Sequence, residues 1–184
     1  MSETHEQLRQ RLLQSQQAVL EVVAHMDAER GHILVNPGWT AQDLLAHLAA
    51  AELGHCAVVQ RLLVGGDTVL PGFNLNTYNN AEVQARRHLG LDELLAEYKA
   101  NRAATLDLLA SIGDDDWDKA GPHPGGFDTT VEGVFRVIAI HEKRHLRDLQ
   151  VALWLVLGRP GWVTPGSLQS RRVLADHRKK SPNS

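Results

Sequence analysis

The sequence predicts an all-α protein, an antiparallel four-helix bundle with a kinked or broken third helix and an irregular C-terminal tail. Apolar residues recur at spacings of three, four and seven over long segments, Gly and Pro clusters separate these segments, and none alternates as a strand would. Amphipathic helices of this kind bury their apolar stripes against one another, which favours a bundle.

The first helix is expected over residues 8–26. One apolar stripe runs along it, formed by Leu8, Leu12, Val19, Val22 and Met26. The second helix is expected to begin after Thr40, because Thr40 and Asp43, three residues later, resemble a capping box. Gly65 and Gly66 end this helix.

A third helix is expected from about Tyr78 to Ile112, with a break near Gly90, after which Asp92 can cap a new segment. The stretch 113–128 is rich in Gly, Pro and Asp and is predicted to be a loop. No part of the sequence predicts a sheet.

The fourth helix carries the most regular apolar stripe and is predicted to run to about Leu157. Thr129 and Glu132 resemble a second capping box at its start. Gly158 and Pro160 are expected to end it. Residues 1–160 are therefore predicted to form one helical domain, and residues 161–184 an irregular, mobile tail.

Composition excludes several classes of function. The formal net charge is −3, and no face of the folded region concentrates Lys or Arg, so we expect no nucleic-acid partner. A lone cysteine, Cys56, gives no disulfide framework. The polar N-terminus and the lack of a long apolar run predict no signal peptide and no membrane span. We expect a cytoplasmic protein.

Three histidines are the candidate functional residues. His141 and His145 are four residues apart on the apolar stripe of the fourth helix, so one ion could contact both. A buried imidazole needs a partner, and His47 lies on the buried side of the second helix. Three neutral imidazoles suit one divalent metal ion, zinc, nickel or ferrous iron, and leave a coordination position open.

Other interpretations of these histidines remain open. They could hydrogen-bond to backbone carbonyls or to a carboxylate such as Glu52. Residues 141–145 also match the H-E-x-x-H signature of zinc proteases, with Glu142 as general base, but the downstream third ligand of that class is absent. His55 is expected to be core or pocket wall, and Cys56 to point away from the site.

Two segments, GWTAQDLLAHLAAAELGH and IHEKRHLRDL, together resemble the DinB-like superfamily, in particular the branch of mycothiol-dependent maleylpyruvate isomerases. The resemblance covers roughly residues 5–157 and implies a metal bound by His47, His141 and His145. It also implies a low-molecular-weight thiol as co-substrate. The isomerase branch often has a further C-terminal domain, which we do not expect here.

The resemblance adds residues that could act around the metal. The stretch NTYNNAEVQARR is similar to the segment that opens the third helix in that branch, so Asn79, Asn80 and Arg86 could bind polar groups of a substrate. Glu52 or Asp148 could orient a ligand imidazole. For each of these residues a capping or surface role is an equal alternative.

Three functions are consistent with these features. The first is a thiol-dependent transferase or isomerase acting on a small electrophile. The second is a small-molecule hydrolase in which Glu142 or Asp148 serves as base. The third is a non-catalytic metal-binding or stress-response bundle. A homodimer through the bundle faces is compatible with all three.

Overall fold

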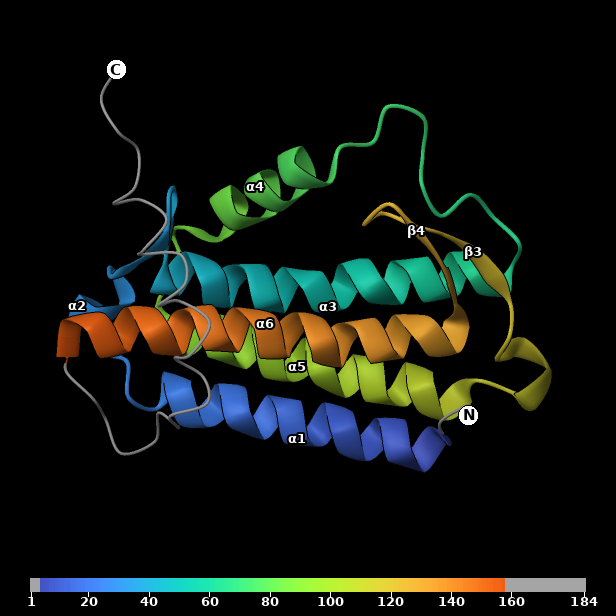
Figure 1. Ribbon diagram of the computed structural model, residues 1–184, viewed down its shortest axis with the longest axis horizontal. Coiled ribbons are helices and arrows are strands. Elements are labelled where there is room, and N and C mark those ends of the chain that lie inside the picture. The colour runs from blue at the N-terminus through green and yellow to red at the C-terminus, as the bar shows by residue number, and fades with distance from the viewer. Residues whose placement is uncertain (1–3, 158–184) are drawn as a thin grey trace, which may run out of the picture.

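Four long helices pack side by side in the computed structural model, which describes residues 4–157 (Figure 1). They are α1 (His5–Val23), α3 (Ala41–Leu63), α5 (Leu91–Ser111) and α6 (Val131–Leu157). Helix α3 packs against α5 and α6, and α1 packs against the same two helices. The predicted four-helix bundle is confirmed. None of the described helices is both long and apolar enough to cross a membrane.

The helix directions are mixed. Helix α6 runs antiparallel to α3, but α5 runs in the same direction as α3 (Figure 1). Contacts between α3 and α5 advance in the same direction along both helices, from Ala49 with Asn101 to Cys56 with Thr105. The reason is the connection between α3 and α5, which carries the chain back along the bundle before α5 begins.

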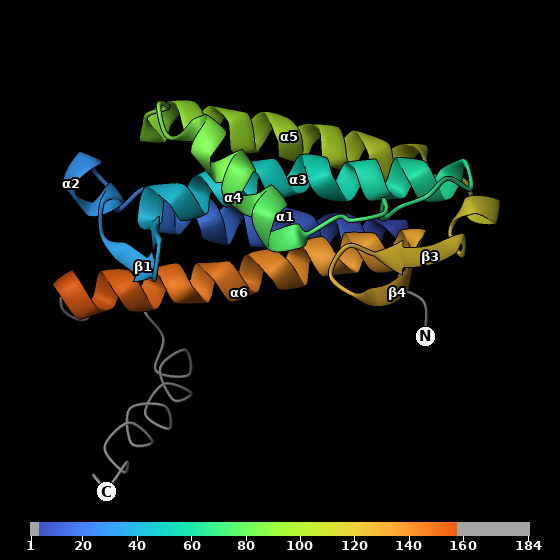
Figure 2. The ribbon, with the colours of Figure 1, turned by 90° about the horizontal axis from the view of Figure 1, so that it is seen from above.

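That connection contains a shorter helix, α4 (Leu75–Arg86), which packs on the outer face of α3 (Figure 2). The break predicted near Gly90 is therefore present, and it separates two helices that lie in different places. Gly90, and not the predicted Asp92, is the N-cap of α5, and its amide donates to the Glu93 carboxylate at 2.8 Å. Arg86 at the end of α4 pairs with Glu82 and with Glu97 of α5, at 2.6 and 2.8 Å.

Helix starts agree with the sequence at α3 and differ elsewhere. The Thr40 and Asp43 capping box is present, with bonds of 3.1 and 3.0 Å. Helix α1 starts at His5, earlier than predicted, because Thr4 caps it, and Met26 lies beyond its end. The predicted box at Thr129 is wrong by one residue: the Gly133 amide donates to the Thr130 hydroxyl at 3.0 Å. Thr130 still pairs in a strand, so α6 begins after it.

Two short hairpins correct the expectation that the chain contains no strands. β1 (Leu34–Asn36) pairs with β2 (Trp39–Thr40), after a one-turn helix α2 (Ala28–Gly31). β3 (Ala120–His123) pairs with β4 (Phe127–Thr130) across a turn in which Gly126 has φ +84°. A 3₁₀ turn, Asp114–Asp116, precedes β3. Strands this short are set by turn chemistry and offer no alternating pattern to detect. The predicted tail and helix stop lie outside the described residues.

The core consists of two apolar clusters with a polar layer between them. One cluster contains Val19, Leu44, Leu94 and Leu149, and the other contains Leu12, Val59, Leu109 and Phe135. Between them each long helix contributes polar side chains: Ser15 from α1, Glu52 from α3, Tyr98, Arg102 and Thr105 from α5, and Glu142 from α6.

Arg102 is the centre of this layer and is fully buried. Its Nη2 lies 2.6 Å from Glu52 Oε1 and 2.7 Å from Glu142 Oε1, and Nη1 donates to the Leu12 carbonyl at 2.5 Å. The Tyr98 hydroxyl donates to Glu142 at 2.5 Å, and burial and this carboxylate raise the Tyr98 pKa. Each buried charge therefore has both an ionic partner and hydrogen bonds, which is the condition under which such groups are tolerated.

Replacing Arg102 tests this layer. Arg102→Met leaves two buried carboxylates without their cation, so we expect the free energy of unfolding to fall by about 3–5 kcal/mol in urea denaturation. Arg9→Met is the control, because Arg9 and Glu6 form a surface pair with half or more of each side chain exposed. It should change the free energy by less than about 0.5 kcal/mol. Equal effects of the two variants would contradict the structural role given to Arg102.

Candidate metal centre

His47, His141 and His145 meet between α3 and α6. Their ligand atoms all lie within 4.8 Å of one another. His141 Nε2 is 3.0 Å from the Nε2 of His47 and 3.0 Å from the Nε2 of His145. The sequence could place only the His141 and His145 pair, and the antiparallel packing of α3 on α6 brings His47 to it. The cluster could hold a metal ion.

Burial keeps these imidazoles neutral. The pKa of His47 is lowered to about 3 and that of His141 to about 2, mainly by burial and then by the neighbouring His145. Burial also lowers the pKa of His145, although the nearby Asp148 carboxylate opposes the shift. Neutral imidazoles have the nitrogen lone pair that a metal requires.

The donor geometry fits a divalent ion. A tetrahedral ion with nitrogen bonds of 2.0–2.1 Å separates its ligand atoms by roughly 3.3 Å. The 3.0 Å contacts around His141 are close to this value. His141 Nε2 also faces two other Nε2 atoms, and a single ring nitrogen cannot satisfy both by donating one proton. A shared cation resolves this, because all three nitrogens can then be acceptors.

The surroundings differ on the two sides of His141. On one side Trp39, just before α3, packs against the His47 ring with centroids 4.8 Å apart. Its indole N–H donates to Asn80 Oδ1 at 3.1 Å, which ties α4 to the site. On the other side lies His55, whose ring centroid is 5.6 Å from that of His141. His47 is buried, whereas His141 and His145 are partly exposed.

The other candidate residues lie in different parts of the structure. Glu52 and Glu142 lie in the polar layer of the core, with their carboxylates paired to Arg102. Arg86 is occupied by two carboxylates on α4 and α5. Asp148 acts electrostatically on His145, so it remains near the centre.

On α4, Asn80 is linked to the histidine cluster through Trp39, whose indole N–H donates to its side-chain oxygen. Asn79, the preceding residue, is partly exposed. Cys56 contacts Thr105 at 3.3 Å and is absent from the histidine cluster, as predicted. Sequence reasoning missed Trp39 and His123, and no spacing rule connects either residue to the three histidines.

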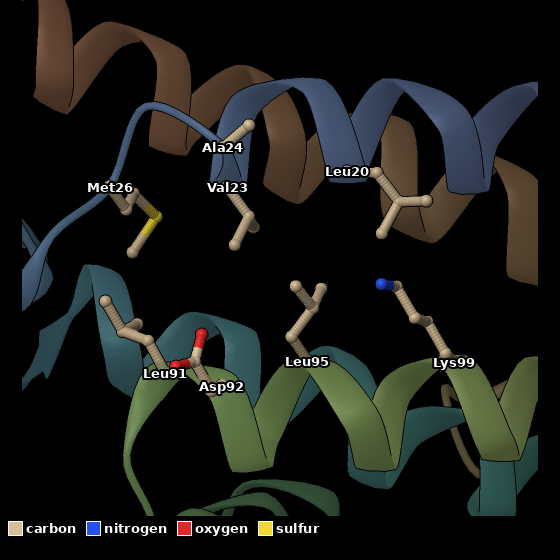
Figure 3. Close-up of a pocket in the computed structure, with 8 residues that line it drawn as sticks. All are labelled: Leu20, Val23, Ala24, Met26, Leu91, Asp92, Leu95 and Lys99. Carbon is tan, nitrogen blue, oxygen red and sulfur yellow. The ribbon is translucent and has the colours of Figure 1, made fainter.

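A separate cavity of about 370 Å³ lies between the end of α1 and the start of α5 (Figure 3). Leu20, Val23 and Met26 line one wall, and Leu91, Leu95 and Lys99 line the other. It shares no residue with the histidine cluster. Asp92 and Lys99 are the titratable residues of its lining.

The neutral histidines predict a pH dependence of stability in the metal-free protein. Unfolded histidine takes up a proton near pH 6.5, whereas folded His47, His55 and His141 do so only near pH 2–3. Below pH 6.5 the unfolded chain therefore binds more protons than the folded chain. The free energy of unfolding then decreases as the pH is lowered, by about 1.4 kcal/mol per pH unit for each such histidine.

Urea denaturation between pH 7 and pH 4.5 measures this slope. His47→Gln should make the slope shallower, since Gln does not titrate. A slope that is the same in both proteins would contradict the neutral, buried state of His47.

Solved structures that resemble this chain include those of two proteins. The mycothiol-dependent maleylpyruvate isomerase matches with a TM-score of 0.69 and 18% identity, over 80% of this chain and 61% of that chain. YfiT from Bacillus subtilis, described as a probable metal-dependent hydrolase with an unusual four-helix bundle topology, matches with a TM-score of 0.69 and 15% identity. That match covers 83% of this chain and 87% of YfiT. At these identities the likeness establishes the fold.

A search of curated proteins finds no match for this chain. The sequence model of the DinB superfamily matches residues 4–149, which include all of the first three long helices and the three clustered histidines of the centre. Together with the four-helix bundle, this match confirms the resemblance seen in the sequence: the chain belongs to the DinB superfamily.

Proposed function

We propose that the chain is a divalent-metal-dependent enzyme in which His47, His141 and His145 hold one ion, most suitably zinc or nickel, with ferrous iron as an alternative. The observation that carries this proposal is the convergence of three neutral ring nitrogens at one partly exposed point. The cluster contains no fourth protein ligand among residues 4–157, which leaves coordination positions for a small molecule and favours catalysis over a purely structural ion.

The reaction proposed is transfer or isomerisation that uses a low-molecular-weight thiol and a small electrophilic substrate. A bound divalent ion would supply a Lewis acid that favours the thiolate form of the thiol, which is the attacking species. Support comes from the fold shared with the mycothiol-dependent isomerase. This chain spans 61% of that protein, so the reaction itself is a proposal. A reduced thiol requires a reducing compartment, in agreement with the predicted cytoplasmic location.

The residues around the centre have separable roles in this proposal. Trp39 covers His47 and limits water on that side. Asn80 accepts from the Trp39 indole through its oxygen, so its amide N–H groups face away from Trp39 and could bind a polar group of the substrate. The Asp148 carboxylate acts on His145 and would favour the positive charge of an ion bound there. All three proposed ligands lie in one chain, so a dimer is not required for the centre.

A small-molecule hydrolase is the second candidate, favoured by the likeness to YfiT over 87% of that chain. Glu142 is unsuited to be its base, because its carboxylate is buried and bonded to Tyr98 and Arg102. Asp148 is the carboxylate that remains near the centre.

Elemental analysis of the purified protein tests the metal. We expect about one zinc, nickel or iron per chain, lost in His47→Ala and His141→Ala, because either change removes a ligand. His32→Ala is the matched control, since His32 is exposed and lies outside the cluster, and it should retain the ion. A metal-free wild-type protein that cannot be reconstituted would overturn the proposal.

Activity assays of the metal-loaded protein separate the two reactions. Maleylpyruvate with mycothiol should be turned over only when the thiol is present, and removal of the ion by a chelator should abolish turnover. Hydrolysis of small ester or amide substrates without added thiol would instead support the hydrolase. Trp39→Ala should leave the ion bound while lowering activity, because Trp39 contacts a ligand ring and lies outside the ligand cluster.

A further inference from the structure

A second pair of histidines lies beside the three proposed ligands. His55 on α3 and His123 at the end of β3 stack with ring centroids 5.5 Å apart and an interplanar angle of 25°. His55 Nδ1 and His123 Nε2 are 3.5 Å apart, at the outer limit of a hydrogen bond. His55 is also in edge contact with His141, at 5.6 Å between centroids. The pair therefore adjoins the metal centre without belonging to it.

The position of His55 is set by the antiparallel packing of α3 on α6. His145 and His47 are at one level, with centroids 4.8 Å apart, and His141 is in contact with both. His55 follows His47 by two helical turns and contacts His141 from the other side. A small molecule bound next to His141 would thus have His55 as a neighbour on the side away from His145.

The hairpin fixes which nitrogen of each ring carries the proton. The Gly125 amide donates to His123 Nδ1 at 3.0 Å, so this nitrogen is the acceptor and the proton of a neutral His123 is on Nε2. That N–H can donate to His55 Nδ1. The proton of His55 must then be on Nε2, which faces away from His123. This chain of three groups leaves one N–H donor on the His55 ring, which is in edge contact with the His141 ring.

The hairpin is built to hold this arrangement. The His123 ring stacks on Phe127 with centroids 4.5 Å apart, and His123 is buried. A side chain at Gly125 would place its Cβ 2.8 Å from the Phe127 ring and 3.0 Å from His123 Nδ1. Only glycine therefore lets the backbone amide approach the imidazole without displacing it. This gives the turn a role beyond the reversal of the chain.

We propose that His55 is a ligand-binding residue, whose Nε2–H donates a hydrogen bond to an anionic oxygen, carboxylate or enolate, of a small molecule bound at the metal centre. His123 is a positioning residue that fixes the His55 tautomer. This proposal rests on the metal function proposed above and adds the oxygen-anion class of ligand to it.

The first test is the tautomer, measured by ¹⁵N NMR of the histidine rings in the zinc-loaded protein. We expect Nδ1 to be unprotonated and Nε2 protonated in both His55 and His123. In His123→Ala the fixed state of His55 should be lost. In His123→Gln it should be kept, since the Gln amide can still donate to His55 Nδ1. A His55 ring protonated at Nδ1 in the wild-type protein would overturn the proposal.

The second test is binding of acetate to the cobalt-loaded protein, followed by the visible spectrum of the ion. His55→Leu should weaken acetate binding by roughly tenfold or more, the usual effect of losing a hydrogen bond to a charged group, with one cobalt still bound. His55→Gln should restore much of the affinity, because its amide keeps a donor near the same place. His32→Ala should have no effect.

The outcomes separate this proposal from the metal function. One cobalt per chain with unchanged acetate affinity in His55→Leu overturns the role of His55 and leaves the metal centre intact. No cobalt in the wild-type protein overturns the metal function, and this proposal with it. Two cobalt ions per chain, with the second lost in His55→Leu, would make the pair a metal site and would also overturn the proposal.

Discussion

The buried ion cluster around Arg102 fixes how far each long helix slides against its neighbours. Glu52 and Glu142 bond the same guanidinium nitrogen, so α3 and α6 have one axial alignment in which both carboxylates are satisfied. His141 directly precedes Glu142, and His47 lies five residues before Glu52. The alignment that pairs the charges therefore also brings the histidines together. Apolar packing alone would tolerate a shift of one helix past another by one turn more readily, because one leucine can take the place of the next. A buried ion pair cannot be shifted in this way without leaving a charge unpaired.

Helices α3 and α6 each have a buried glutamate on one face and the clustered histidines on another. The carboxylates of Glu52 and Glu142 pair with Arg102 in the core. The histidine rings contact Trp39, which bonds to α4, and His123 of the β3 and β4 hairpin. Both α4 and this hairpin lie beside the long helices of the bundle (Figure 2). This separation explains why an H-E-x-x-H sequence here is not arranged as in a protease. Adjacent residues on a helix are about 100° apart around its axis, so Glu142 and His141 face different surroundings.

Elements outside the bundle surround the proposed metal centre and would determine what it can bind. Trp39, ahead of α3, and Asn80, on α4, bound the His47 side, and the hairpin places His123 next to His55. The four long helices provide a rigid scaffold, and the connections between them supply the contacts that would distinguish one ligand from another. Members of a superfamily can therefore share the bundle and differ in reaction, as the isomerase and YfiT do in their described activities.

The sequence by itself determined the long helices, the capping box of Thr40 and the one-face spacing of His141 and His145, because these depend on residues within one or two turns of each other. It also identified His47, through its place on a buried stripe and the family resemblance. The tertiary structure alone decided that α5 runs parallel to α3, that Glu52 and Glu142 pair with Arg102, and that His123 meets His55. These contacts join residues 40 to 68 positions apart, and no local periodicity records which distant partner a side chain will find.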